Sequence, residues 1–107
     1  EKWLHFMITQ LIHNAVKYSA EKSDEILLKV YQRGRNLVLE VEDFGIGIDS
    51  SDIKRIFDRF YTGEIGRKYR ESTGVGLYLV REVASYLGHR IEVESEVGEG
   101  TMFRIVF

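Results

Sequence analysis

Three glycine pairs in this chain stand beside residues that can handle a nucleotide. They are Asp43-Phe44-Gly45-Ile46-Gly47, Gly74-Val75-Gly76-Leu77 and Gly98-Glu99-Gly100-Thr101. Glycine lets a backbone approach a ligand closely and adopt positive φ, although a single pair is equally compatible with an ordinary turn. Three pairs, one led by an acid and one at the start of a helical pattern, predict loops that wrap a nucleotide.

Asp43 continues an alternating strand pattern whose apolar members are Leu37, Leu39 and Val41. This period of two places the carboxylate on the buried face, where it needs a hydrogen-bond donor. The exocyclic amino group of adenine is such a donor, and the glycines that follow leave room for the base. An aspartate before glycine also caps turns. The pattern leaves both interpretations open.

Asn14, Lys17 and Tyr18 share one edge of a predicted helix because they are three and four residues apart. An amide oxygen suits Mg²⁺, a lysine can meet a phosphate, and a tyrosine can flank a base. A solvated helix face is the simpler explanation of this spacing taken alone. The pair Gly74 and Gly76 opens a helix, whose N-terminus favours phosphate, but such a pair is also common by chance.

Periodicity predicts the elements that position these residues. We expect two layers, with helices packed on one face of a sheet made of antiparallel strands, an α+β fold. The second helix should turn Leu79, Val80, Val83, Ala84 and Leu87 inward and end at Gly88. The expected elements are a helix at residues 2–19, a connector at 19–24, strands at 26–31 and 37–43 with a turn at 32–36, helix caps at 50–52 before an apolar set at 53–60, a polar stretch at 62–73, a helix at 75–87, and strands at 91–96 and 101–107 with a turn at 98–100.

Composition limits the class of protein. The 107 residues are 44% hydrophobic, which suits one compact domain. A net charge of −2 argues against a nucleic-acid partner, and the absence of cysteine excludes thiolate metal sites and disulfides. The chain contains no apolar run long enough for a membrane helix. Helical periodicity begins at once, so we expect a domain of a longer protein.

Five ordered segments together resemble the motifs of bacterial sensor histidine kinases. Residues 10–18 resemble their N box, 43–48 the G1 box, 56–61 the F box, 73–77 the G2 box and 95–101 the G3 segment. The resemblance implies a Bergerat-type domain over residues 1–107: a two-layer α/β sandwich whose mixed, mostly antiparallel sheet is covered on one face by helices. ATP and Mg²⁺ would lie between the layers.

The resemblance also implies roles for particular residues. Asn14 would ligate Mg²⁺, Asp43 would bind the adenine amino group, and Thr101 would orient water beside it. Residues 59–73 would form a lid over ATP, rooted by Phe57 and Phe60, with Arg67, Lys68 or Arg70 reaching the phosphates. The implied cofactor-binding residues are Asn14, Lys17, Tyr18, Asp43, Gly45, Gly47, Ile48, Phe57, Gly74, Val75, Gly76, Leu77 and Thr101, and the implied catalytic residues are Gln10, Asn14 and Lys17.

Gln10 favours phosphotransfer over hydrolysis. Related gyrase-type and chaperone-type ATPases have a glutamate here that activates water, and a glutamine accepts no proton at neutral pH. Sensor kinases commonly have asparagine at this position, and Tyr78 replaces a glycine that often ends their G2 box. Three alternatives remain: an anti-sigma-type serine kinase, a non-catalytic nucleotide-binding signalling module, and an interaction domain without a ligand.

The phosphate acceptor is expected outside this chain. His5, His13 and His89 lack the following acid and proline of family acceptors, and the chain contains no proline. The resemblance therefore implies an acceptor and dimerisation domain N-terminal to residue 1, a homodimeric parent protein in the bacterial membrane with this domain in the cytoplasm, and a response regulator as partner. Residues 62–67 and 72–80 resemble intramembrane-sensing kinases for bacitracin and other antimicrobial peptides, which work with an ABC transporter.

Overall fold

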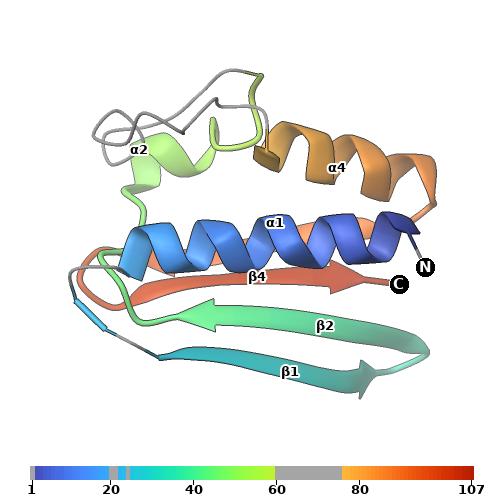
Figure 1. The fold of residues 1–107 in the computed structure, drawn as a ribbon, viewed down its shortest axis with the longest axis horizontal. Helices are drawn as coiled ribbons and strands as arrows, with labels where there is room; N and C mark the ends of the chain where they lie inside the picture. Colours follow the sequence, from blue (N-terminus) through green and yellow to red (C-terminus); the bar gives the residue numbers. More distant parts are fainter. Residues whose placement is uncertain (1, 20–21, 24, 60–75) are drawn as a thin grey trace.

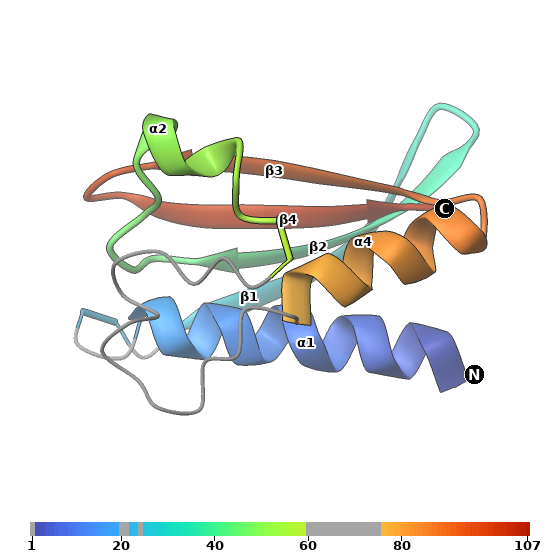
Figure 2. The same ribbon diagram turned by 90° about the horizontal axis from the view of Figure 1, so that it is seen from above.

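The computed structural model describes residues 2–19, 22–23, 25–59 and 76–107. Helices lie on one face of a four-stranded sheet, and α1 and α4 run side by side in opposite directions (Figure 1, Figure 2). The expected two-layer α+β architecture is confirmed. In chain order the elements are α1 (Lys2–Ser19), β1 (Ile26–Arg33), β2 (Asn36–Asp43), α2 (Ser50–Ile53), α4 (Gly76–Tyr86), β3 (Arg90–Glu96) and β4 (Gly100–Val106).

The strand order β1-β2-β4-β3 brings distant residues together at one end of the sheet. Asp43 pairs with Thr101 across β2 and β4, and Thr101 pairs with Ser95 across β4 and β3. Paired residues point to the same face, so these three side chains share the face toward the helices. A mixed, mostly antiparallel sheet was expected, and every strand pair among the described residues is antiparallel.

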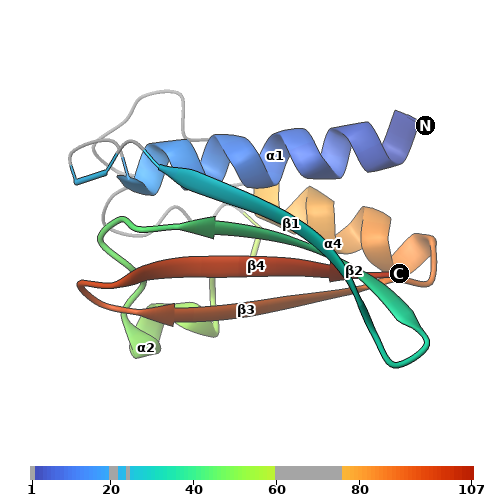
Figure 3. The same ribbon diagram turned by 90° about the horizontal axis from the view of Figure 1, so that it is seen from below.

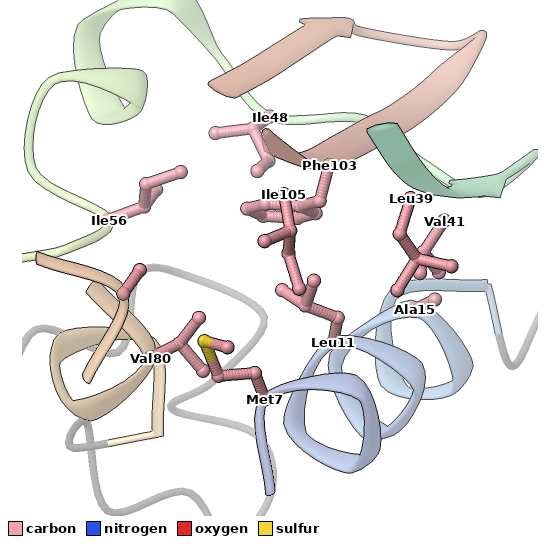
Figure 4. Packing of buried hydrophobic residues seen from close by; sticks show 11 residues of the cluster. Met7, Leu11, Ala15, Leu39, Val41, Ile48, Ile56, Val80, Phe103 and Ile105 are labelled. Atoms are coloured by element: carbon pink, nitrogen blue, oxygen red, sulfur yellow. The ribbon is translucent and has the colours of Figure 1, made fainter. Parts of the chain in front are cut away.

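The core lies between α1, α4 and the two central strands (Figure 4). The four-residue spacing of Met7, Leu11 and Ala15 gives α1 one buried stripe, which meets Phe103 and Ile105 of β4. Of the residues predicted to face inward from α4, Leu79 is 40% exposed. That prediction was wrong because the buried stripe of α4 centres on Val80 and Ala84, and Leu79 lies at its solvent margin.

Capping and turns differ in detail from the sequence prediction. Asp49 caps α2 by accepting the Ser51 N–H at 2.8 Å, so the cap precedes the predicted residues 50–52. The β1–β2 ladder continues to the pair Arg33–Asn36, which shortens the predicted five-residue turn to two residues. The predicted stop of α4 at Gly88 is confirmed: this residue has φ 79°, and the next N–H donates to the Ala84 carbonyl at 2.8 Å.

Figure 3 shows the sheet from the side opposite to the helices. This face carries a charged network around Glu40 and Arg104. Glu40 is only 4% exposed there, and its Oε1 accepts from Arg104 Nε at 3.0 Å and from the Tyr31 hydroxyl at 2.8 Å. Hydrogen bonds to Glu94 and Glu40 raise the pKa of Arg104, while burial opposes them as the largest single influence. Arg104 therefore compensates a carboxylate that is shielded from water.

We expect Arg104→Met to lower the free energy of unfolding by about 2–4 kcal/mol, because it leaves the buried Glu40 charge with weaker partners. The matched control is Arg33→Met, which removes an exposed arginine that pairs with Glu92 at 2.8 Å. That control should change stability far less, since exposed pairs contribute little. Urea unfolding monitored by circular dichroism measures both variants. Equal losses in the two variants would contradict the expectation.

Candidate nucleotide site

The carboxylate of Asp43 is the centre of the site. Asp43 ends β2 with 2% of its surface exposed. Its Oδ1 accepts the backbone N–H groups of Gly45 at 3.0 Å and Thr101 at 3.2 Å. Its Oδ2 is buried and has no hydrogen-bond partner within the described part of the chain. The turn cap that the sequence allowed therefore occupies one oxygen and leaves the other available.

The surroundings of Asp43 make its ionised form less favourable than it is in water. Burial raises the pKa of its carboxyl, and the N–H groups of Gly45 and Thr101 only partly oppose this. A carboxyl pKa that is higher in the folded state stabilises the fold fully below the ordinary value, and this stabilisation is lost as pH rises through the raised value. At neutral pH the ionised group therefore costs stability until a donor reaches Oδ2.

Three glycines allow backbone segments to touch around Asp43. A Cβ on Gly45 would lie 2.3 Å from the Tyr18 carbonyl oxygen, and one on Gly47 would lie 2.2 Å from that of Glu96. A Cβ on Gly100 would lie 2.1 Å from the carbonyl oxygen of Asp43 itself. The Cβ position of each of these glycines is thus occupied by backbone of a neighbouring segment. These glycines bring the walls of the site together.

Hydrogen bonds join the same segments. The Ile46 N–H donates to the Tyr18 carbonyl at 3.3 Å, and its carbonyl accepts the Gly98 N–H at 2.9 Å. The ammonium of Lys22 donates to the carbonyls of Gly45, at 3.3 Å, and Gly98. The end of α1, the loop after β2 and the β3–β4 turn therefore form one unit. Sequence reasoning missed Lys22 because a lysine in a polar connector carries no distinguishing pattern.

The predicted residues Asn14, Lys17 and Tyr18 of α1 are all partly buried. Asn14 Nδ2 is buried without a partner among the described residues, which argues against the simple solvated face. Burial is the main cause that raises the pKa of Tyr18, and the Lys17 ammonium lies 5.6 Å from the centre of its ring. Gln10 approaches α4 so closely that a Cβ on Gly76 would lie 2.7 Å from its Oε1.

Phe57 and Ile48 are part of the hydrophobic core. The Phe57 ring packs edge-on against Phe103, with centroids 6.3 Å apart, and Ile48 is buried in the core. Leu77, also predicted to contact the cofactor, packs against the same core. Gly74, Val75, Phe60, Arg67, Lys68, Arg70 and residues 60–73 of the predicted lid lie outside the described residues.

Ser95 is a site residue to which the sequence analysis assigned no role, although it lies in the segment 95–101. Its Oγ accepts the Ile48 N–H at 2.7 Å and lies 2.9 Å from the Gly100 carbonyl oxygen and 2.7 Å from Thr101 Oγ1. The sequence does contain an indication of this role, because Ser95 continues the inward-facing series of Ile91 and Val93 in the alternating pattern of its strand. A hydroxyl on an apolar face usually has specific partners.

The described residues contain no group of three or more histidine, cysteine, aspartate or glutamate side chains placed to hold a metal ion. The cation contact at Asn14 stays a prediction. None of the helices in the described ranges combines the length and apolar character that a membrane span requires.

The chain belongs to the histidine kinase-, DNA gyrase B- and HSP90-like ATPase family, whose model matches residues 1–107. Its relatives include the sensor histidine kinase YxdK and the sensor protein BceS of Bacillus subtilis, at 54% and 47% identity, and the sensor histidine kinase GraS of Staphylococcus haemolyticus, at 42%. These matches confirm the resemblance to sensor histidine kinases. Each covers 99% of this chain but only 33%, 31% and 30% of the relative, so the chain spans about a third of their length.

A solved structure shares the fold. It is the crystal structure of full-length ShkA in complex with AMPPNP, with a TM-score of 0.81 and 24% identity. The match covers 97% of this chain and 21% of that one. The arrangement of helices over an antiparallel sheet therefore recurs in a much longer protein.

Proposed function

We propose that this domain binds ATP with Mg²⁺ and supplies the γ-phosphate to a histidine outside these 107 residues. Membership of an ATPase family and the names of the relatives support a kinase. The observation that carries the proposal is Asp43 Oδ2, a buried acceptor without a partner in the described structure. A buried acceptor of this kind calls for a donor from a ligand.

The adenine base fits this acceptor. Its amino group can donate to Asp43 Oδ2, which removes the cost of the unpaired charge. Thr101 would hold water beside this contact. AMPPNP, the nucleotide in the ShkA complex, carries the same base on a similar fold. The proposed surroundings of the base are Tyr18, Gly45, Gly47, Ile48 and Phe57.

The triphosphate would extend from Asp43 toward α1 and the start of α4. The Asn14 amide oxygen would give Mg²⁺ one protein ligand, as is common where phosphates and water supply the others. Mg²⁺, when bound, neutralises phosphate charge. Lys17 would meet a phosphate directly. The N–H groups of Gly76 and Leu77 at the first turn of α4 would donate hydrogen bonds to phosphate oxygens, and we assign the same role to Gly74 and Val75, which precede them in the sequence.

Gln10 favours transfer over hydrolysis, because its side chain cannot remove a proton from water at neutral pH. The incoming nucleophile would be a histidine of the protein's own acceptor and dimerisation domain. We further propose a homodimeric parent in the bacterial membrane, a response regulator as the next phosphate acceptor, and an ABC transporter as a partner in sensing. The names of the relatives, all sensors, support this assignment.

Titration calorimetry of the purified chain with Mg²⁺ and AMPPNP tests the binding step. We expect saturable binding, with amide resonances of residues 43–48 and 100–101 shifting in parallel NMR spectra. With radiolabelled ATP, we expect no stable phosphohistidine at His5, His13 or His89, and labelling only of a separately supplied acceptor domain. Absence of binding would overturn the proposal. Binding with fast release of phosphate to water would instead indicate a hydrolase.

A further inference from the structure

The hydroxyl of Ser95 has three neighbours and a single proton. The Ile48 N–H can only donate, and the Gly100 carbonyl oxygen can only accept. If Ser95 gave its proton to Thr101, two oxygens would lie 2.9 Å apart with no proton between them. Every contact is satisfied when Ser95 donates to Gly100 and accepts from both Ile48 and Thr101.

This assignment decides what Thr101 offers to a ligand. The proton of Thr101 Oγ1 is committed to Ser95, so its remaining capacity is as an acceptor. Thr101 is paired with Asp43 across β2 and β4 and points to the same face. Both side chains are buried, with Thr101 3% exposed. The base edge of the site therefore presents Asp43 Oδ2 and Thr101 Oγ1, and both accept.

We propose that Ser95 is a positioning residue that sets the polarity of the Thr101 hydroxyl, so that the site selects 6-amino purines over 6-oxo purines. Adenine carries an amino donor at this position, whereas a 6-oxo base carries an acceptor. A carbonyl oxygen turned toward two fixed acceptors finds no proton. The inference deepens the proposed function and rests on it.

The test compares ADP with inosine diphosphate, whose bases differ in the 6-amino and 6-oxo groups. Dissociation constants with Mg²⁺ come from calorimetry on the 107-residue chain and on its Ser95→Ala variant. We expect the wild type to prefer ADP by about a hundredfold, and Ser95→Ala to reduce that preference about tenfold. In the variant, the freed Thr101 hydroxyl can rotate and donate to the 6-oxo group. Ser95→Thr, which keeps the hydroxyl, should restore the preference.

A double-mutant cycle separates this role from a purely structural one. Ser95→Ala should leave the ADP preference of a Thr101→Val chain unchanged, because the hydroxyl through which it acts is gone. Loss of stability alone would weaken the binding of both nucleotides equally and leave the ratio of their dissociation constants unchanged. A wild-type ratio in Ser95→Ala, or an equal change in the Thr101→Val background, would overturn the inference.

Two further results keep the comparison decisive. If Ser95→Ala does not fold, Ser95→Cys replaces it, because a thiol is a weak donor and acceptor. If the wild type binds neither nucleotide, the proposed function fails. If it binds ADP selectively but Ser95 variants keep the selectivity, only the role of Ser95 fails.

Discussion

Asp43→Asn is expected to weaken ATP binding by at least about a hundredfold, because an amide nitrogen at the Oδ2 position would face the amino donor of the base. The same change should stabilise the nucleotide-free domain by roughly 1 kcal/mol, or about 4 °C in melting temperature, since it removes an ionised carboxylate whose second oxygen has no partner in the described structure. Oδ1 contacts with Gly45 and Thr101 can persist through the amide oxygen.

The pH dependence provides an independent check of this expectation. Burial raises the pKa of Asp43, so lowering the pH toward the ordinary aspartate value protonates the wild-type group in the folded state. The stability advantage of Asp43→Asn should therefore be full at neutral pH and shrink in acid. Calorimetric titration with AMPPNP and thermal unfolding between pH 4 and pH 8 give both readouts.

Asp58→Asn is the matched control, because Asp58 is exposed and only weakly paired with Arg55 at 4.0 Å. It should change neither binding nor melting temperature appreciably. Retention of near wild-type ATP affinity by Asp43→Asn would contradict the assignment of this carboxylate to the base. Loss of binding together with loss of stability would mean that the buried charge is compensated in the free domain.

Gly100→Ala should lower the free energy of unfolding by more than about 4 kcal/mol, or prevent folding altogether. The residue has φ 131°, and its Cβ would lie 2.1 Å from the backbone oxygen of Asp43, which cannot move without breaking the β2–β4 ladder. The effect combines backbone strain with a steric clash.

Gly98→Ala separates these two causes, because Gly98 lies in the same turn with φ 87°. Within the part of the chain that the structure describes, its added Cβ would meet no atom within 4 Å beyond its chain neighbours. Strain alone should cost it about 1–2 kcal/mol. Urea unfolding of both variants measures the difference. Equal destabilisation would show that the turn relaxes and that the close approach at Gly100 is not rigid.

The sequence allows the frame of this domain to be predicted, but not the details of its contacts. Period-two alternation is a local property, so the burial of Asp43 at the end of its strand could be anticipated. The sequence does not show that Oδ1 is hydrogen-bonded while Oδ2 is left without a partner in the described structure. This difference depends on the Thr101 N–H, which is 58 positions away and is brought near only by the strand order. The motifs indicated a nucleotide site because all five occur in the same order as in sensor histidine kinases, whereas each motif alone is compatible with an ordinary turn or helix face.

Errors arose where neighbours in space decide the outcome. Leu79 fits the apolar pattern of its helix, yet it is exposed because the buried stripe of α4 centres on Val80 and Ala84. Ser50 has a side chain that also suits a helix cap. It is instead the first residue of α2, so the cap position falls on Asp49. Ser95 and Lys22 acquire their roles from partners in other segments, and no local pattern reveals them.

The glycines around Asp43 limit how this domain can evolve. At Gly45, Gly47 and Gly100 an added methyl group would meet main-chain atoms, so these positions cannot contribute side chains of their own. Any change in the preferred base must therefore come from the few neighbouring residues that can vary, or from wholesale rebuilding of the loops. We therefore expect related proteins to differ in what they sense and in what they phosphorylate, while they keep the same nucleotide.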